Sequence, residues 1–305
     1  MLELYELQVF LVAAATENFS EAGRRLQMSQ PAVSGHIHAL EERLKVQLFE
    51  RTGRNIKLND VGQALVPVAR KLLKEAELLE EFVASQRGSL TGHLLLGCST
   101  AAGKYILPRI MARFQERHPD VKIACQVGPR GQALDDLVEG KVDLAVSSLR
   151  VPRRAIEYHH FADDELVLIV PPDHVWASRE NINPVELLDY PLILREPSSG
   201  TMFTLNRALA EADLSLDMLP SNLTLWNSEA IVQAVSVGIG AGFVSSITAE
   251  LALQHHIVVQ VPIVAFAPVQ SLYMARHTGF SASEAQTVFW EFTFASENMD
   301  LRPII

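Results

Sequence analysis

Apolar residues recur every three or four positions through residues 1–59, the spacing of short helices that bury one face. Asn18 or Ser20 can cap a second helix, and Ser29 followed by Pro31 can open a third. The predicted apolar faces hold Leu4, Leu7, Phe10, Leu11 and Ala14 in the first helix, Ala22 and Leu26 in the second, and Val33, Ile37, Leu40 and Leu44 in the third. This part of the chain is therefore expected to be a small helical head.

A single long helix is predicted over residues 60–88. Its apolar stripe consists of Val61, Leu65, Val68, Leu72, Leu79 and Phe82. Glu75 fills the one polar position of this register, and Pro67 should kink the helix because it has no backbone N–H. Such a stripe predicts a seam between two copies of the chain. The segment Arg87-Gly88-Ser89, together with Gly92, predicts a hinge.

From residue 92 onward, apolar runs typical of buried strands alternate with stretches typical of helices. The runs HLLLGC, VKIACQV and VDLAVSS enclose the helical stretches YILPRIMARFQERH and ALDDLVEG. This βαβαβ order predicts a parallel sheet with right-handed crossovers. A second set of strands, ELVLIV, PLIL, NLTLW, GAGFV and IVVQV, predicts a second lobe. The strand SLYMAR and the helix SEAQTVFWEFTFASE are expected to return to the first lobe.

The second and third helices of the head have the layout of a helix-turn-helix, with a turn at Gln27-Met28. A recognition helix begins with short polar groups that reach base edges in the major groove. Gln30 can pair with adenine, Ser34 can bond a base or a phosphate, and Pro31 and Ala32 can touch thymine methyls. The alternative is a plain helical domain with ordinary surface charges, because helix-turn-helix patterns also arise by chance.

The segment LFERTGRNIKLN after the third helix predicts a two-stranded wing that turns at Thr52-Gly53. Arg51, Arg54 and Lys57 would then lie along the phosphate backbone of DNA. The full set of predicted DNA contacts is Arg24, Ser29, Gln30, Pro31, Ala32, Ser34, His36, Arg51, Arg54 and Lys57.

Charge is distributed unevenly along the chain, whose formal net charge is -10. Residues 1–60 carry seven Lys or Arg against eight Asp or Glu, and the segment 43–57 is locally basic. A basic edge on a weakly charged head can neutralise phosphates, while the acidic remainder limits non-specific DNA binding. An acidic N-terminus and the lack of a long apolar run favour a cytoplasmic protein without membrane contact.

Small hydroxyl residues follow several predicted strands at their carboxyl ends, where α/β sheets bind ligands. Helix N-termini at these points also favour anions, although each hydroxyl could equally be only a helix cap. The predicted effector-binding residues are Ser99, Thr100, Ser147, Ser148, Ser198, Ser199, Gly200, Thr201, Asn227 and Ser228. Their recurrence at equivalent strand ends predicts one shared pocket for a small polar or anionic molecule.

These patterns predict an α/β protein with a helical head. We expect a winged helix-turn-helix at residues 1–59, a linker and dimerisation helix at 60–88, and an effector-binding domain at 89–305. This last domain should be a hinged, two-lobed α/β body like that of periplasmic binding proteins. Lobe I would take about 92–161 and 269–305, and lobe II about 162–268.

The run AGRRLQMSQPAVSGHIHALEERLKVQLFERTGRNIKLNDVG closely resembles the DNA-binding domain of LysR-type transcriptional regulators. GCSTAAGKYILP and REPSSGT resemble the effector-domain signatures of that family, in the branch near regulators of carbon fixation and sulfur assimilation. The resemblance implies that Ser99, Thr100, Ser199, Gly200 and Thr201 line an inducer cleft between the lobes. The expected partners are double-stranded promoter DNA, a small effector, further copies of the chain in a dimer or tetramer, and RNA polymerase.

Three positions depart from the family pattern. Gly35 stands where the family usually has Arg, Lys or Gln, so His36 is a substitute base reader or a plain surface residue. Ala101 stands where related sequences often have Thr, and Met202 where they often have Arg. The missing arginine argues against a phosphorylated or strongly anionic ligand.

Other chemistry finds little support in the residues. The pairs His159-His160 and His255-His256 have no supporting ligands, so no metal or cofactor is expected. Cys98 and Cys125 fall on predicted neighbouring strands, so they are a redox pair or, the favoured interpretation, two buried thiols. No nucleophile or paired acid and base indicates an enzyme. A solute-binding protein of a transporter is the main alternative to a regulator, and the helical head argues against it.

Overall fold

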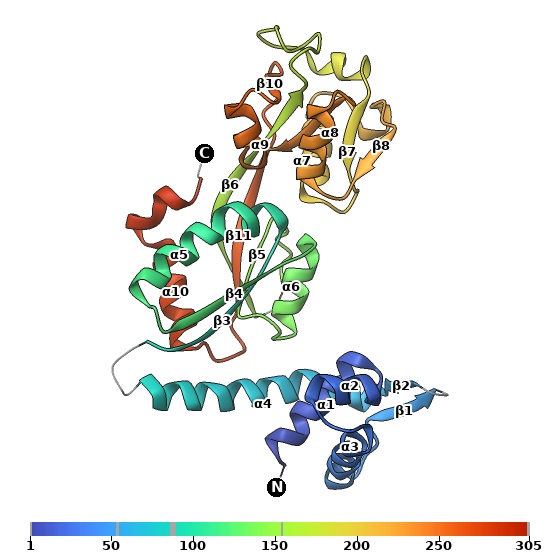
Figure 1. The fold of residues 1–305 in the computed structure, drawn as a ribbon, viewed down its shortest axis with the longest axis vertical. Helices are drawn as coiled ribbons and strands as arrows, with labels where there is room; N and C mark the ends of the chain where they lie inside the picture. Colours follow the sequence, from blue (N-terminus) through green and yellow to red (C-terminus); the bar gives the residue numbers. More distant parts are fainter. Residues whose placement is uncertain (1, 53–54, 86–89, 154, 304–305) are drawn as a thin grey trace.

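The computed structural model describes residues 2–52, 55–85, 90–153 and 155–303. Figure 1 shows three parts in order along the chain: a helical head, a long helix, and an α/β body of two lobes. None of the helices in these ranges is long and apolar enough to cross a membrane.

The head consists of α1 (Leu4–Thr16), α2 (Phe19–Leu26) and α3 (Gln30–Leu44), followed by the antiparallel strands β1 (Phe49–Thr52) and β2 (Asn55–Leu58). Its core contains Leu7, Phe10, Ala22, Val33, Ile37 and Leu40 from the predicted helix faces, with Leu48, Phe49 and Ile56 from the wing. The wing turn itself, at 53–54, lies outside the described residues.

Helix caps and one close approach fix the geometry of the helix-turn-helix. Asn18, and not Ser20, caps α2 by accepting from the backbone N–H groups of Ser20 and Glu21. Ser29 caps α3, as predicted, by accepting from the N–H of Ala32. At Gly23 a Cβ would lie 2.7 Å from the carbonyl oxygen of Met28, so the tight turn between the helices requires glycine.

The long helix α4 spans Asp60–Ser85 and continues through Pro67. Leu65, Val66, Ala69 and Leu73 pack against the core of the head. Val61, Val68, Leu72, Leu79 and Phe82 remain exposed in the single chain. The predicted hinge at Arg87-Gly88-Ser89 lies outside the described residues, and Gly92 after it has a φ of +134°.

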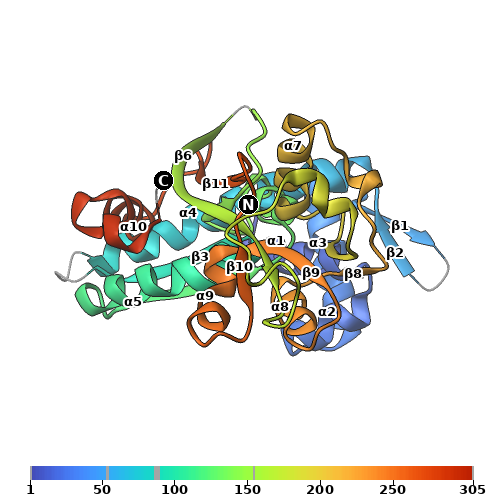
Figure 2. The same ribbon diagram turned by 90° about the horizontal axis from the view of Figure 1, so that it is seen from above.

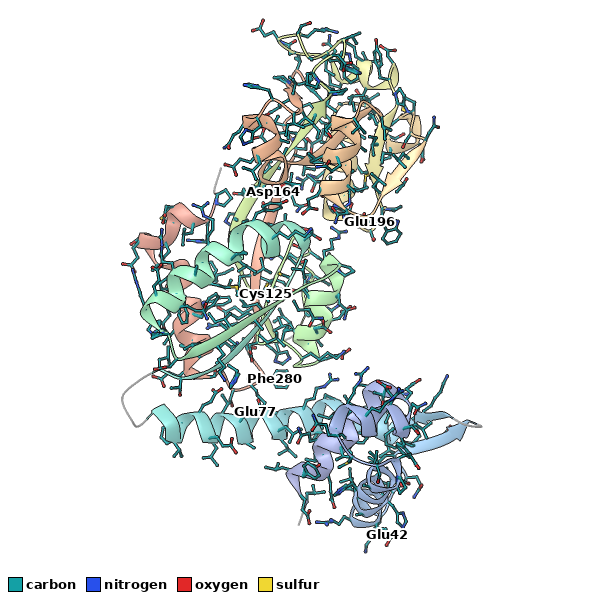
Figure 3. All side chains as sticks on the ribbon, in the orientation of Figure 1. Glu42, Glu77, Cys125, Asp164, Glu196 and Phe280 are labelled. Atoms are coloured by element: carbon teal, nitrogen blue, oxygen red, sulfur yellow. The ribbon has the colours of Figure 1, made fainter. Side chains whose placement is uncertain are left out.

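Beyond the head, α4 packs along lobe I. Lys74 forms a 2.8 Å ion pair with Asp143, and Arg70 forms a 3.0 Å ion pair with Glu139. Because Asp143 also accepts from the N–H of Leu95, this ion pair connects α4 to a strand of lobe I. Figure 3 labels Glu77 of α4 and Phe280 of lobe I close to this contact.

Lobe I is built on β3 (Gly92–Cys98), β4 (Val121–Val127), β5 (Leu144–Ser147) and β11 (Val269–His277). As predicted, β3 pairs in parallel with both β4 and β5. The helices are α5 (Leu107–Arg117), α6 (Arg130–Val138) and α10 (Glu284–Phe294), with the short helix η4 (Ser296–Leu301) after α10. The predicted helix before residue 118 is preceded by a π-helical turn, η1 (Ala102–Ile106). β4 lies at the sheet edge, so of its residues only Val121 is buried.

Lobe II is reached by β6 (Ile156–Val170), which is far longer than the predicted ELVLIV strand. β6 pairs with β11 in its first part and with β9 (Ala241–Ser245) and β10 (Val259–Val261) in its second part. The remaining elements are β7 (Leu192–Arg195), β8 (Leu223–Leu225), α7 (Gly200–Glu211), α8 (Ser228–Ser236), α9 (Ser246–Gln254), η2 (Pro184–Leu188) and η3 (Leu216–Met218).

β6 and β11 therefore run through both lobes and connect them (Figure 1). Seen from above, α4 runs beneath lobe I and carries the head to one side, with the wing strands far from α10 (Figure 2). This arrangement places lobe I between the head and the space that separates the two lobes.

Candidate nucleic-acid interface and ligand pocket

The first turn of α3 presents polar groups to solvent. Gln30 and Pro31 are exposed, while Ala32 and Ser34 are half-buried. The Ser29 hydroxyl caps the helix. Ser29 is nevertheless exposed, so it can also contact DNA. Gly35 is exposed, and a Cβ there would meet nothing within 4 Å. The structure therefore leaves room for a side chain at the position where this sequence has none.

His36 lies in the second turn of α3 and packs against an aromatic ring. The centroids of the His36 and Tyr5 rings are 5.2 Å apart in an edge-to-face arrangement. This contact holds a half-buried imidazole between α1 and α3, so His36 is more than an isolated surface residue.

The basic residues predicted to face phosphates have different surroundings. Arg24 is highly exposed and pairs with Glu21 on the same helix. Lys57 is exposed on β2. Arg51 lies on β1, but its side chain, like the whole of Arg54, falls outside the described part of the chain.

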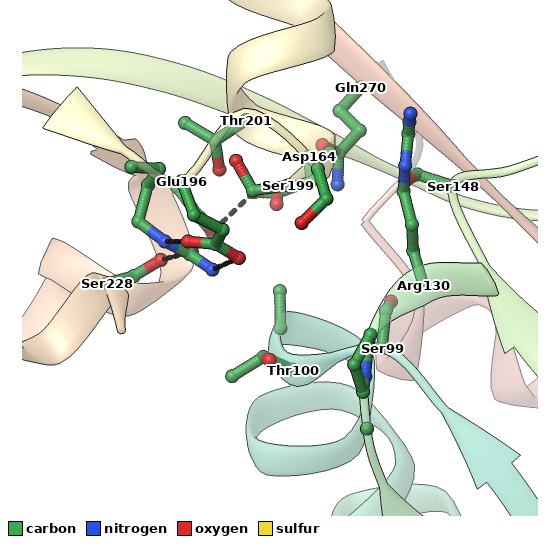
Figure 4. A pocket seen from close by; sticks show the side chains of 17 residues that line it. Ser99, Thr100, Arg130, Ser148, Asp164, Glu196, Ser199, Thr201, Ser228 and Gln270 are labelled. Carbon is green, nitrogen blue, oxygen red and sulfur yellow. Dashed lines mark hydrogen bonds and ion pairs between the residues drawn. The ribbon is translucent and has the colours of Figure 1, made fainter. Parts of the chain in front are cut away.

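A cavity that is open to solvent, with about 540 Å³ of empty space including its mouth, lies between the lobes and gathers most of the predicted effector residues. Lobe I contributes the ends of β3 and β5 and the start of α6, lobe II contributes the starts of α7 and α8, and the connecting strands contribute the far wall. Its lining is Ser99, Thr100, Ala101, Gly128, Pro129, Arg130, Ser148, Asp164, Arg195, Glu196, Ser198, Ser199, Gly200, Thr201, Ser228, Ser245 and Gln270. Figure 4 shows side chains from both lobes pointing into the space.

Four polar atoms on this lining are buried without a hydrogen-bond partner. They are Ser99 Oγ, Ser148 Oγ, Asp164 Oδ2 and Gln270 Oε1. Buried polar groups in folded proteins are nearly always paired, with protein, water or ligand, because an unpaired group costs about 1–3 kcal/mol. Their convergence on one cavity indicates a site for a polar ligand or ordered water.

Asp164 and Gln270 are paired residues on β6 and β11. One oxygen of Asp164 accepts a 2.6 Å bond from the hydroxyl of Ser245, and the other is free. Burial raises the pKa of Asp164 from 3.8 to about 6, against the opposing effect of the Ser245 hydrogen bond. The carboxyl group can therefore change its charge within the physiological range.

The two arginines of the lining are held differently. Arg195 makes two 2.8 Å bonds to the carboxylate of Glu196 and also donates to the hydroxyl of Ser228, so its charge is already compensated. The guanidinium of Arg130 lies 4.9 Å from the ring centroid of Phe203, across from α6 to α7. Burial lowers the pKa of Arg130, and it remains the cation most open to a ligand anion among the lining residues described.

Two further contacts show how closely the lobes approach. A Cβ on Gly200 would lie 2.4 Å from Gln270 Oε1 and 2.6 Å from Ser148 Oγ, so a larger residue at the start of α7 would displace these two side chains. On the rim, Lys104 and Tyr105 of lobe I bond to Glu229 of lobe II at 2.6 and 3.1 Å.

Ser147 and Asn227 belong to the predicted set but do not line the cavity. The Ser147 hydroxyl donates to the carbonyl of Arg130 and accepts from the N–H of Leu149. Asn227 caps α8 by accepting from the N–H groups of Glu229 and Ala230. Both side chains therefore shape the neighbouring segments and do not face the cavity.

Sequence reasoning missed the charged part of the lining, namely Arg130, Asp164, Arg195 and Glu196, together with Ser245 and Gln270. A usable signal existed for Asp164, because the charged pair Asp163-Asp164 directly precedes the apolar run of the predicted strand ELVLIV. Among the described residues no group of His, Cys, Asp or Glu has the arrangement of a metal site.

Comparison with known protein families accounts for both halves of this architecture. The family described as "Bacterial regulatory helix-turn-helix protein, lysR family" matches residues 4–63. The family described as "LysR substrate binding domain" matches residues 87–296, which is more than half of the chain.

Individual proteins agree with these matches. The RuBisCO operon transcriptional regulator of Allochromatium vinosum is 30% identical over 292 residues, covering 96% of this chain and 95% of that protein. Full-length OxyR from Pseudomonas aeruginosa has the same fold, with a TM-score of 0.72 at 22% identity and coverage of 97% and 96%. The CcmR regulatory domain of Synechocystis, solved in complex with 2-PG, has a TM-score of 0.61 at 26% identity and covers 67% of this chain and 96% of that one. The chain therefore belongs to the LysR family: it is a transcriptional regulator with a DNA-binding head and an effector-binding domain, and not an enzyme.

Proposed function

We propose that the regulator senses a small hydroxylated acid in the cavity between its lobes. The observation that carries this proposal is the convergence of four unpaired polar atoms, two from lobe I and one from each connecting strand, on one space whose other wall is the start of α7 in lobe II. A ligand that satisfies atoms of both lobes binds the closed form better than an open one. Only such a difference in affinity can shift a conformational equilibrium.

The chemistry of the unpaired atoms selects the ligand class. Asp164 Oδ2, when ionised, and Gln270 Oε1 accept hydrogen bonds only, so they require donors such as ligand hydroxyl groups. Arg130 and the N–H groups at the start of α7 favour an anion on the same molecule. Met202, at a position where related sequences often have arginine, is buried in the core of lobe II, and Arg130 would bind the anion in its place. Binding of 2-PG by the CcmR regulatory domain is consistent with a small-molecule effector.

On the DNA side, we propose that Gln30 and Ser34 contact bases while Arg24, Lys57 and the wing residues Arg51 and Arg54 contact phosphates. Ser29, Pro31, Ala32 and His36 would complete the contact surface. The exposed start of α3 supports this assignment, because that end of a recognition helix enters the major groove.

For assembly, we propose a dimer or tetramer joined through α4. Val68, Leu72 and Leu79 are 53%, 43% and 64% exposed in the single chain, although they share a stripe on one helix. Exposed apolar stripes of this kind mark interfaces. The domain limits proposed from the sequence, 1–59, 60–88 and 89–305, follow the order of these roles. We also propose that the regulator works in the cytoplasm, beside the chromosome. A further proposed partner is RNA polymerase.

A thermal-shift screen tests the ligand proposal. Full-length protein is heated with small hydroxy acids, phosphorylated acids and matched neutral polyols, and a ligand that binds only folded protein raises the Tm. We expect the acids that carry both an anion and hydroxyl groups to raise the Tm, and Arg130→Ala to reduce the shift. Arg150→Ala, outside the cavity, is the control. Equal shifts with Arg130→Ala and with wild type would show that the anion does not bind here.

A further inference from the structure

The chain has two cysteines, and the structure brings them together. Cys98 ends β3 and Cys125 lies on the neighbouring strand β4, with 3.0 Å between their sulfur atoms. Along the parallel pairing, Cys98 is opposite Val127 and Cys125 is opposite Leu96, so the cysteines are offset by two residues. The sulfurs are therefore in contact although the cysteines are far apart in sequence.

Local packing leaves space for the sulfurs and little else. The π-helical turn η1 passes over Cys98, and a Cβ on Gly103 would lie 2.3 Å from its sulfur and 2.7 Å from a methyl of Val127. A disulfide bond is about 2.05 Å long, so the sulfurs would need to approach by only about 1 Å. Diagonal residues on neighbouring strands have Cα atoms about 7–8 Å apart, the upper limit for a disulfide, so closing the bond also requires a small inward shift of the edge strand β4.

We propose that Cys98 and Cys125 are a redox modification site, at which a peroxide converts the two thiols into a reversible intramolecular disulfide. Cys125 is half-buried on the edge strand, while Cys98 is fully buried. This difference in exposure assigns the first encounter with the oxidant to Cys125 and the closing step to Cys98.

The contact also prepares the two thiols for these roles. The hydrogen bond from the Cys98 thiol lowers the pKa of Cys125, and the same pairing, with burial, raises the pKa of Cys98. The Cys125 thiolate is the nucleophile, because thiolates react with peroxide and thiols do not.

The reaction balances in two steps. The Cys125 thiolate attacks hydrogen peroxide, the O–O bond breaks, and a sulfenic acid and hydroxide result. The Cys98 sulfur then attacks the sulfenic sulfur, the S–O bond breaks, and the departing hydroxide takes the Cys98 proton as water. Two thiols and one peroxide give one disulfide and two waters, and a dithiol reductant reverses the change.

The site adjoins the cavity wall on lobe I. Cys98 precedes Ser99, and its carbonyl oxygen accepts a 2.9 Å bond from the N–H of Gly128, next to Arg130. A disulfide would couple the two lining segments and change the response to the effector. This consequence rests on the proposed function, whereas formation of the disulfide does not.

Thiol counting and mass spectrometry test the site directly. Reduced full-length protein, freed of reductant under nitrogen, is treated with one equivalent of hydrogen peroxide. We expect both titratable thiols to disappear, an intact monomer mass two hydrogens lighter, and a Cys98–Cys125 cross-linked peptide that dithiothreitol removes. Retention of both thiols, a link between chains only, or irreversible oxidation without the cross-link would overturn the proposal.

Single variants separate the two roles. Cys98→Ala should leave a Cys125 sulfenic acid that dimedone traps, whereas Cys125→Ala should leave Cys98 unreactive. Trapping at Cys98 in the second variant would contradict the assignment. Gly103→Ala should slow disulfide formation severalfold by pressing on Cys98, and Gly131→Ala, where a Cβ meets nothing within 4 Å, should not. Equal rates in these two variants would show that the observed contact does not govern the reaction.

Discussion

Individual side chains decide the chemistry of this regulator, and Asp164 illustrates how burial changes the acidity of a carboxyl group. Its carboxyl group lies between the lobes with one oxygen bonded to Ser245 and the other unpaired. The nearby charges are Glu165 on its own strand and, across the cavity, the paired Arg195 and Glu196 and the cation of Arg130. Protonation of this one group changes the balance of charge that a ligand meets.

The raised pKa of Asp164 predicts a pH-dependent stability. Near pH 5 the folded protein keeps a proton on Asp164 that the unfolded chain has released, because the pKa is about 6 when folded and 3.8 when unfolded. This contribution is lost as the pH rises through 6, on the order of 1 kcal/mol between pH 5 and 7. Urea unfolding of Asp164→Asn should show a smaller change over this range than wild type, whereas the exposed variant Asp217→Asn should match wild type. A wild-type slope in Asp164→Asn would refute the shift.

Glu41 shows a structural role for a residue within the run that resembles LysR-type DNA-binding domains. Its buried carboxylate accepts from the N–H groups of Leu48 and Phe49 and so joins α3 to the wing. Glu41→Ala leaves both donors unpaired and should lower the free energy of unfolding of the head by about 1–3 kcal/mol. Glu42→Ala, whose side chain is 73% exposed, is the matched control. Equal melting temperatures of the two variants would contradict this role.

Among the residues that line the cavity, most of the hydroxyl residues were predicted from the sequence and the charged residues were not. Ser99, Thr100, Ser199 and Thr201 follow strand ends, and strand ends can be located from apolar runs alone. Asp164 and Gln270 lie within the connecting strands, and their position depends on the pairing of β6 with β11, which joins distant parts of the chain. Local patterns carry no information about that pairing.

At the scale of secondary-structure elements, α4 has two functional faces, one against the head and one exposed to solvent. One face packs on the head through residues such as Leu65 and Ala69, and another leaves Leu72 and Leu79 exposed. A third contact, the Lys74–Asp143 ion pair, connects the same helix to lobe I. The helix is thus in position to pass a change in lobe I to the head.

The exposed stripe of α4 predicts an interface between subunits. Leu72→Glu would place a charge in an apolar seam and should dissociate the oligomer, with loss of DNA binding. Leu72→Met conserves volume and should behave as wild type. Light scattering after size-exclusion chromatography measures the effect. An unchanged mass for Leu72→Glu would place the interface elsewhere.

The exposed start of α3 predicts base recognition by Gln30. On a DNA site selected by wild-type protein from random sequences, Gln30→Ala should relax specificity and cost roughly 1–3 kcal/mol. Lys57→Ala should weaken selected and random DNA about equally and reduce the salt dependence of binding. Fluorescence anisotropy measures both. If Gln30→Ala also weakens both DNAs equally, Gln30 is not a base reader.

The apolar periodicity predicted the boundaries of those helices and strands whose extent depends on residues near them in the sequence. The caps at Ser29 and Asn18, the start of α4 and the parallel strands β3, β4 and β5 were all predictable. The full length of β6 was not, because its first half, beginning at Ile156, alternates polar and apolar residues and is extended only through its pairing with β11. The π-helical turn η1 was not foreseen either, since a helical period does not distinguish π from α turns.

In the whole molecule, lobe I and α4 lie between the cavity and the DNA-binding head. The cavity closes between lobes that already touch through Lys104 and Glu229, and α4 joins lobe I to the head. An effector that favours closure would alter the spacing of paired heads, which must match the helical repeat of DNA.

The most direct measurement of this claim is a DNase I footprint on the selected DNA site, with and without the acid that gives the largest thermal shift. Wild type should change its footprint when the acid is added. Ser99→Ala and Thr201→Val, both at the cavity, should bind the DNA as wild type does and show no change with the acid. If either variant keeps the full response to the acid, or loses DNA binding while its affinity for the acid stays normal, the cavity is not the sensor.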